Sequence, residues 1–229
     1  MIQRPHLWLQ DLGDVGGDPS VLSAQERAWS EALPAAIARR YRASRSLLRR
    51  RLSPLLQCPP GQVPLESPPG QPPRLAAAAA GWVSLSHSGG ALLLGWSPQP
   101  IGVDLEWAER PLDAAALVCR YFPAPERLQL EDLEPSALRS AVLRSWVIKE
   151  AAIKWRRTSL AQELRHWCWD HERRRLQHLR GDHAPAVSLR RVGPWLCAAV
   201  GAGISTSHWD LPTGASSDAD RFGLDDESF

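Results

Sequence analysis

The sequence lacks the features that would place this protein in a membrane or in an oxidising compartment. No run of about 18 apolar residues is present, which a membrane-spanning helix would need. Residues 1–6 show no apolar stretch typical of a secretory signal. The four cysteines, Cys58, Cys119, Cys168 and Cys197, form no CxxC pair. We therefore expect a cytoplasmic protein with reduced thiols and no membrane association.

The composition is otherwise ordinary for a globular chain, but its charge is unevenly distributed. The 229 residues, 44% hydrophobic and 23% charged, suffice for one domain or two small ones. The net charge of +2 conceals two clusters of opposite sign. The basic cluster consists of Arg39, Arg40, Arg42, Arg45, Arg49, Arg50 and Arg51, and the acidic one of Asp210, Asp218, Asp220, Asp225, Asp226 and Glu227. The arginines indicate a phosphate-bearing partner or an acidic protein surface.

Hydrophobic periodicity and turn residues predict a mixture of helices and strands. Ser23 and Glu26 are spaced as a capping box that opens a helical segment at 23–52, which Pro34 divides. Further predicted helices cover 112–134, broken by prolines, and 136–157, and predicted strands cover 82–86, 91–96, 101–106, 164–170, 174–180, 186–191 and 195–202. Residues 59–73 hold seven prolines and predict a loop. We predict an α+β fold with mainly antiparallel pairing.

Two carboxylates alternate within the strand predicted at 101–106. Residues i and i+2 of a strand point to the same face, so Asp104 and Glu106 should lie side by side, opposite Val103 and Leu105. Adjacent carboxylates repel each other unless a cation lies between them. Hard oxygen ligands on a rigid strand suit Mg²⁺, which fills its remaining positions with water and phosphate oxygens.

The helix predicted at 136–157 adds a third carboxylate. Trp146, Glu150 and Lys154 follow one another at i, i+4 spacing and share one helix face. Together with Lys149 they supply groups suited to a polyphosphate. Alone, each pattern also fits an ordinary surface: a solvated strand face, an exposed helix with a Glu–Lys pair, or a turn at residues 86–90 with a solvated histidine. Their joint occurrence favours one shared site.

The combination resembles the 4′-phosphopantetheinyl transferases, specifically the larger Sfp-type branch. The segment 101–106 satisfies every position of the family pattern (I/V)-G-(I/V)-D-(I/V/L)-E. The segment 146–154 satisfies W-x-x-K-E-(A/S)-x-x-K, and residues 86–89 form the S-H-S-G element upstream. The arginines and Tyr41 of segment 40–49 are similar to the family's N-terminal helix. The resemblance covers about residues 20–200.

The resemblance implies a pseudo-dimer of two similar α+β halves, each a small, mainly antiparallel sheet packed with helices. We place the N-terminal half at 1–108, including the Asp104 strand, and the C-terminal half at 109–204. An acidic tail, 205–229, is rich in Gly, Ser and Asp, and we expect it to be poorly ordered. A pseudo-dimer of this kind needs no partner subunit, so we expect a monomer.

The resemblance also implies a reaction: transfer of 4′-phosphopantetheine from coenzyme A to a serine of an apo acyl or peptidyl carrier protein, releasing 3′,5′-ADP. It implies that Asp104, Glu106 and Glu150 hold Mg²⁺, with Mn²⁺ as an alternative. Glu150 is also the candidate base for the serine proton. Lys154 would neutralise the departing phosphate, and Lys149 would orient Glu150 or contact the pyrophosphate.

The resemblance implies that the coenzyme is held by residues of segments 86–89 and 146–154 and of the predicted N-terminal helix. The predicted contacts are Arg40, Arg45, Ser86, His87, Lys149 and Lys154. Two positions depart from the family pattern: Gln71 stands where a lysine helps to hold the coenzyme, and Ala36 stands near the place of an arginine. The carrier protein and the pathway that it serves remain open.

Two other classes of protein compete with this interpretation. A nucleic-acid-binding protein would use the arginines of 39–51, but it would not explain the carboxylates, which repel a phosphate backbone. We therefore expect no nucleic-acid partner. A zinc protein would use His166, Cys168 and His171, whose spacing fits no common zinc finger. A relative that binds coenzyme A without turnover is a further alternative.

Overall fold

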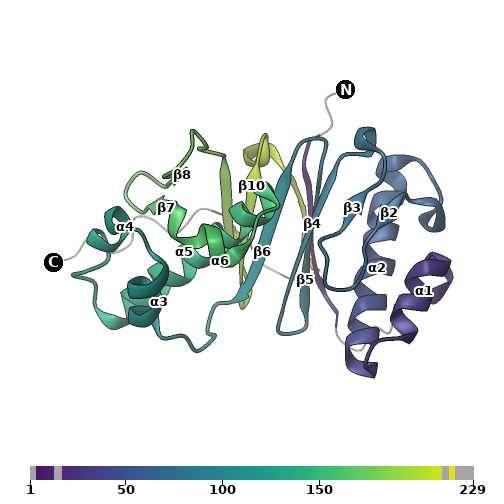
Figure 1. The fold of residues 1–229 in the computed structure, drawn as a ribbon, viewed down its shortest axis with the longest axis horizontal. Helices are drawn as coiled ribbons and strands as arrows, with labels where there is room; N and C mark the ends of the chain where they lie inside the picture. The colour runs from purple at the N-terminus through teal and green to yellow at the C-terminus, as the bar shows by residue number, and fades with distance from the viewer. Residues whose placement is uncertain (1–3, 13–16, 213–216, 220–229) are drawn as a thin grey trace.

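The computed structural model describes residues 4–12, 17–212 and 217–219, and in this part the chain forms four layers. Two four-stranded sheets occupy the centre, with a long helix on the outer face of each (Figure 1). Separate hydrophobic clusters fill the spaces between helix and sheet on either side and between the two sheets. The predicted α+β class with mainly antiparallel pairing is confirmed.

The N-terminal half contains one sheet and one 22-residue helix. Its elements are β1 (His6–Asp11), α1 (Ala24–Glu31), α2 (Ala35–Leu56), β2 (Leu65–Glu66), β3 (Arg74–Leu75), β4 (Trp82–Ser88) and β5 (Ala91–Ser97). The predicted capping box is present: Ser23 accepts a hydrogen bond from the Glu26 amide, and the Glu26 carboxylate accepts one from the Ser23 amide. Pro34 separates α1 from α2, as predicted.

The C-terminal half repeats this order of elements. It runs through β6 (Ile101–Trp107), α3 (Ala114–Tyr121), α4 (Ala124–Leu128), α5 (Pro135–Arg156), α6 (Leu160–Glu163), β7 (Trp167–Asp170), β8 (Arg175–His178), β9 (Val187–Val192) and β10 (Trp195–Gly201). Each half thus has a first strand, helices that include one of 22 residues, a small two-stranded sheet and a strand pair that joins the first strand. Short 3-10 helices cover Pro19–Val21, Pro60–Gln62, Ala78–Ala80, Leu164–His166 and Ile204–Thr206.

The strand order corrects the predicted boundary between the halves. The sheets have the orders β11-β1-β5-β4 and β12-β9-β10-β6. Strand β6 therefore pairs with β10 of the C-terminal sheet, with Asp104 opposite Ala198, although we predicted it in the N-terminal half. The repeat places the boundary between β5 and β6, because each half begins with its own first strand.

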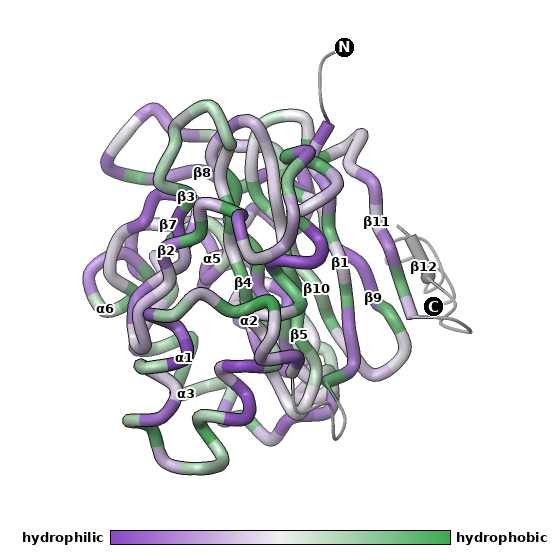
Figure 2. Tube along the Cα trace, turned by 90° about the vertical axis from the view of Figure 1, so that its right-hand side faces the viewer, coloured by the Kyte–Doolittle hydropathy of each residue, from purple (hydrophilic) through white to green (hydrophobic). Residues whose placement is uncertain are grey.

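The two sheets come together along their edge strands, β4 and β6. No ladder pairs these strands in the described part of the chain; instead the Val103 amide donates a hydrogen bond to the Ser84 hydroxyl at 3.1 Å. Leu7, Leu93 and Leu105 are among the side chains that fill the space between the sheets. Figure 2 shows hydrophobic segments along the central strands. The edge contact brings the serines of β4 beside the carboxylates of β6.

The C-terminal segment is a second correction. We expected everything beyond residue 204 to be poorly ordered, but β11 (His208–Asp210) pairs in parallel with β1 of the N-terminal sheet (Figure 2). An ion pair at 2.8 Å between Arg51 of α2 and Asp210 supports this crossing. Strand β12 (Ser217–Ala219) pairs with β9. The rest of the predicted tail, 213–216 and 220–229, lies outside the described residues.

A search of the described helices found none with the length and apolar character needed to cross a membrane.

Candidate active site

The candidate site lies where β6 packs against α5. Asp104, on the face of β6 toward α5, is 2% exposed, and its neighbours Val103 and Leu105 pack into the cluster between the sheets. Gly102 explains the close approach of the two elements. A Cβ at this position would overlap the carbonyl oxygen of Ala151 and stand 2.9 Å from the Cα of Trp155. The absence of a side chain lets the helix rest on the strand at Ala151 and Trp155, the residues that directly follow Glu150 and Lys154.

This packing brings the three predicted carboxylates together. Asp104, Glu106 and Glu150 each offer a ligand oxygen, and these oxygens all lie within 4.8 Å of one another. Asp104 is buried, whereas Glu106 and Glu150 are partly exposed. The strand contributes two carboxylates and the helix one, as the sequence predicted.

Lys154 and Ser86 are bound to one oxygen of Asp104. The Lys154 ammonium donates to Asp104 Oδ1 at 2.6 Å and to the Ser86 hydroxyl at 3.0 Å, and that hydroxyl donates to the same oxygen at 2.7 Å. The second oxygen, Oδ2, is buried and has no hydrogen-bond partner within the described residues. A buried carboxylate oxygen without a partner is costly, so it is a ready ligand for a cation.

Burial and mutual repulsion make the cluster receptive to positive charge. Desolvation, followed by the charge of Asp104, raises the pKa of Glu106 above its ordinary value. Desolvation and the charge of Asp104 raise the pKa of Glu150 to about 7. The three oxygens, the orphaned Oδ2 and the raised pKa values fit a divalent cation with hard oxygen ligands, such as Mg²⁺.

The predicted coenzyme contacts divide between two neighbouring places. Arg40, Arg45 and His87 line a cavity of about 170 Å³ beside α2, with Gly70 from the proline-rich loop also in its wall. Ser86 instead belongs to the network of Asp104 and Lys154. The cavity lies near the carboxylate cluster, because the charge of Lys154 is close enough to lower the pKa of His87.

The side chains that line the cavity are suited to bind an anion. The Arg45 guanidinium lies 4.7 Å from the centre of the Tyr41 ring and donates to the Ser44 hydroxyl at 3.0 Å. Burial, with the nearby charges of Arg45 and Arg40, lowers the pKa of His87 to about 4. Neutral His87 keeps a buried Nε2 without a hydrogen-bond partner in the described part of the chain. Two guanidinium groups and one imidazole are thus available to phosphate oxygens.

Lys149 does not join this site, and the prediction that it contacts the coenzyme is wrong. Its side chain is fully buried on another face of α5, where the ammonium lies 2.6 Å from Glu126 Oε2 and 3.7 Å from the centre of the Phe122 ring. It is one residue from Glu150, a rotation of about 100° around the helix axis, so the two side chains diverge.

Sequence reasoning missed three residues around these groups. Glu126, fully buried in α4, is the partner of Lys149. Ser88 donates to Glu106 Oε2 at 3.2 Å, and Arg110 forms an ion pair with Glu106 Oε1. The alternation of Ser84, Ser86 and Ser88 along one strand was a signal for Ser88. A buried lysine requires a carboxylate partner, but no local pattern identifies which one.

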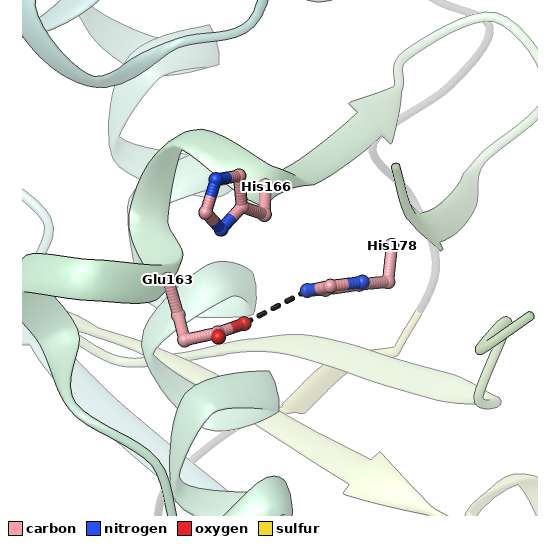
Figure 3. A group of neighbouring side chains, drawn as sticks. All are labelled: Glu163, His166 and His178. Carbon is pink, nitrogen blue, oxygen red and sulfur yellow. Dashed lines mark hydrogen bonds and ion pairs between the residues drawn. The ribbon is translucent and has the colours of Figure 1, made fainter. Parts of the chain in front are cut away.

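A second cluster of potential metal ligands lies at the end of α5. Figure 3 shows Glu163, His166 and His178 converging, with a 2.8 Å contact between Glu163 Oε2 and His178 Nε2. However, Arg156 Nη1 lies 3.1 Å from that carboxylate oxygen and 2.9 Å from the same imidazole nitrogen. The carboxylate already has a cation, so the cluster is an ion-pair contact between α5, α6 and β8.

The zinc alternative gains no support from this part of the molecule. His166 lies in the cluster of Figure 3, but neither potential metal group of the described residues includes Cys168 or His171. His171 Nε2 instead lies 3.0 Å from the Ser145 hydroxyl. Burial raises the pKa of Cys168 to about 11, which disfavours the thiolate that zinc requires.

Comparisons with known proteins agree with this geometry. Residues 100–200 match the family model of the 4′-phosphopantetheinyl transferase superfamily, a range that includes β6 and α5. A protein of Synechocystis sp., provisionally named a 4′-phosphopantetheinyl transferase, is 31% identical over 160 residues. The aligned region covers 67% of this chain and 65% of that relative, so the chain spans slightly less than two thirds of the relative's length. The chain belongs to the 4′-phosphopantetheinyl transferase superfamily.

Proposed function

We propose that the protein transfers 4′-phosphopantetheine from coenzyme A to a serine of an apo acyl or peptidyl carrier protein. The observation that carries the proposal is the convergence of Asp104, Glu106 and Glu150 with Lys154, beside a cavity lined by Arg40, Arg45 and His87. A metal-binding carboxylate cluster next to a basic cavity suits a pyrophosphate substrate with a further phosphate.

The reaction exchanges one phosphorus–oxygen bond for another. The serine oxygen bonds to the phosphorus that carries pantetheine, the pyrophosphate bond breaks, and 3′,5′-ADP leaves. The serine proton passes to Glu150, the carboxylate that α5 contributes to the cluster. Family membership supports a carrier-protein serine as the acceptor.

The residues present also suit the magnesium ion that we propose as cofactor. Asp104 through its free Oδ2, with Glu106 and Glu150, would hold the ion. When bound, Mg²⁺ stabilises the negative charge of the pyrophosphate; Mn²⁺ offers similar chemistry. Lys154, held by Asp104 and Ser86, is placed to donate a hydrogen bond to a phosphate oxygen.

In the cavity, Arg40 and Arg45 would bind the phosphates of the coenzyme farther from the bond that breaks. His87 would donate a hydrogen bond from Nε2 in the tautomer that carries its proton there. Because Arg45 and His87 are largely buried, their hydrogen bonds to an anion would face little competition from water. These contacts would orient the pyrophosphate toward Glu150.

The nucleic-acid alternative loses support because several arginines of the cluster are paired with acidic groups of neighbouring segments. Arg49 is 1% exposed and bonds to Glu26 at 2.7 Å and to the Val63 carbonyl at 3.0 Å. Arg50 pairs with Asp18, and Arg51 pairs with Asp210. These ion pairs attach α2 to its neighbours and offset part of the positive charge that a phosphate backbone would need.

The test is mass spectrometry of an apo carrier protein incubated with coenzyme A, Mg²⁺ and the purified protein. The proposal expects a gain of one phosphopantetheine, absent with EDTA and with Glu150→Gln. Several unrelated carrier proteins should be tried, since the proposal does not specify the cognate one. Coenzyme A binding without transfer to any carrier would favour the non-catalytic relative, and salt-sensitive nucleic-acid binding without coenzyme A binding would favour the alternative class. A monomeric state and a cytoplasmic location stay predictions.

A further inference from the structure

Arg110 lies at the edge of the carboxylate cluster, four residues beyond Glu106. Strand β6 ends at Trp107, and the chain turns so that the Arg110 amide donates to the Trp107 carbonyl at 3.0 Å. Arg139 of α5 fastens this turn by donating to the carbonyls of Ala108 at 3.0 Å and Arg110 at 2.7 Å. The backbone is therefore held in place, while the Arg110 side chain is 35% exposed.

The side chain of Arg110 occupies one oxygen of Glu106, a candidate metal ligand. Glu106 Oε1 forms an ion pair with Arg110, and Glu106 Oε2 accepts a hydrogen bond from Ser88 at 3.2 Å. Both oxygens of this carboxylate are thus in use. Asp104 differs, because its cation, Lys154, contacts Oδ1 and leaves Oδ2 without a partner.

The charges of the cluster also distinguish the role of Arg110 from that of Lys154. Arg110 and Lys154 together bring two positive charges to three carboxylates. A divalent cation brings the same two charges, and a guanidinium in contact with one of its ligands would repel it. Lys154 can stay in place, since it is bonded to the oxygen that a metal need not use. Arg110 cannot keep its contact if Glu106 turns Oε1 to the metal.

We propose that Arg110 is a competing counter-ion for Glu106, which lowers the metal affinity of the free protein and releases Glu106 when the divalent cation enters. The inference rests on the metal site of the proposed function and adds a residue outside its motifs. Arg110 is a positioning residue here: it acts on Glu106 and touches neither the coenzyme nor the acceptor serine.

The test measures metal binding directly, without the transferase reaction. Mn²⁺ binding is followed by electron paramagnetic resonance and calorimetry for the wild type, Arg110→Gln and Arg110→Lys. Removing the competing charge should strengthen Mn²⁺ binding by about fivefold, the factor that corresponds to a partly exposed ion pair of about 1 kcal/mol. Arg110→Lys keeps the charge and should remain within about twofold of the wild type.

Arg191→Gln is the matched control for loss of a positive charge. Arg191 is similarly exposed, on β9, and it forms an ion pair with Glu109 at 3.6 Å, which is not a carboxylate of the cluster. This variant should bind Mn²⁺ as the wild type does. Thermal melting of all variants in EDTA verifies that each is folded before its affinity is compared.

The outcomes separate this inference from the proposed metal site. If Mn²⁺ binds the wild type and Glu150→Gln weakens it, but Arg110→Gln leaves the affinity unchanged or reduces it, the counter-ion role is wrong. Equal gains in Arg110→Gln and Arg191→Gln would also overturn it, because the effect would be one of net charge. If neither the wild type nor Arg110→Gln binds Mn²⁺, or Glu150→Gln has no effect, the metal site itself fails.

Discussion

Gly102 of β6 lies directly against the backbone of Ala151 in α5, so closely that a Cβ would overlap the Ala151 carbonyl oxygen. This contact sets the distance between the strand that carries Asp104 and the helix that carries Glu150. The glycine is therefore required by the packing of two elements, because the side-chain volume of any other residue would separate them.

Gly102→Ala should separate β6 from α5. We expect a loss of about 1–3 kcal/mol in the free energy of unfolding, the usual cost of forcing extra volume into a packed core. Mn²⁺ affinity should fall with it, since the three carboxylates would no longer converge. Gly61→Ala is the control, because the nearest atom to an added Cβ there is 4.0 Å away. Urea denaturation and Mn²⁺ titration measure both effects; an unchanged affinity would mean that Gly102 does not set the geometry of the site.

Glu150→Gln should stabilise the metal-free protein at alkaline pH while it abolishes transfer. Burial and the charge of Asp104 raise the pKa of Glu150 to about 7, above the ordinary 4.5. The folded state thus binds the proton more tightly than the unfolded state, and this contribution, complete below about pH 4.5, is lost as the pH rises through 7. Glutamine cannot ionise, so at pH 8 in EDTA the variant should melt about 2–6 °C higher than the wild type.

Two further measurements test the same prediction for Glu150→Gln. Near pH 4.5 the melting temperatures of the two proteins should converge, because the wild-type carboxyl is then protonated in the folded state. Adding Mg²⁺ at pH 8 should raise the melting temperature of the wild type more than that of the variant. Transfer should fall by at least about 10²-fold. A variant less stable than the wild type at pH 8 would contradict the raised pKa of Glu150.

Lys149 and Lys154, the two lysines of segment 146–154, should differ sharply in their reactivity toward amine reagents. Lys149 and Lys154 are the only lysines in the chain, so amine labelling followed by mass spectrometry has two side-chain targets besides the N-terminus. The side chain of Lys154 is 32% exposed and that of Lys149 is fully buried. We expect a mild amine reagent to modify Lys154, and coenzyme A with Mg²⁺ to protect it. Modification of Lys149 in the folded protein would contradict its burial.

Substitutions should separate the two lysines in the same way. Lys149→Met leaves Glu126 buried without its cation and should cost about 3–5 kcal/mol of stability. A second change, Glu126→Gln, should recover part of this loss, because it removes the uncompensated charge. Lys154→Met also removes the cation of a buried carboxylate, Asp104, but from a partly exposed position, so it should cost less stability than Lys149→Met and reduce transfer strongly. Equal stability losses for both methionine variants would argue against the different surroundings of the two lysines.

Gln71→Lys should strengthen coenzyme A binding. Gln71 is exposed and follows Gly70, which lines the cavity of Arg40 and His87. A lysine here would add one cation near the proposed phosphate contacts and should lower the KM for coenzyme A by about fivefold, with kcat little changed. Gln62→Lys, at an exposed site in the 3-10 helix Pro60–Gln62, controls for net charge. An equal decrease of KM in both variants would show that Gln71 has no special position.

Local patterns in the sequence were sufficient for the parts of the site that lie on single elements. Alternation in β6 predicts Asp104 and Glu106 on one face, and i, i+4 spacing in α5 predicts Glu150 and Lys154 on one face. The capping box of α1 and the break at Pro34 follow from the same short-range rules. These features depend on backbone geometry within a few residues, which the sequence determines directly.

Lys149 shows what such local patterns do not predict. Its position in the motif beside Glu150 indicated a shared role, but the helical rotation turns it into the core, where Glu126 of α4 meets it. The pairing of Arg110 with Glu106 likewise depends on a turn that Arg139 of α5 holds in place. Periodicity can place a side chain on a face, but the partner on that face comes from a distant segment.

The sequence by itself therefore determined the α+β class, most of the elements and the residues that form the carboxylate cluster. Only the tertiary structure decided that β6 belongs to the C-terminal sheet, that β11 crosses to the N-terminal sheet, and that Arg45 and His87 share one cavity. The physical reason is that strand pairing and charge pairing are chosen among many compatible partners. That choice depends on how the whole core packs, because every backbone group and buried charge must be satisfied at the same time.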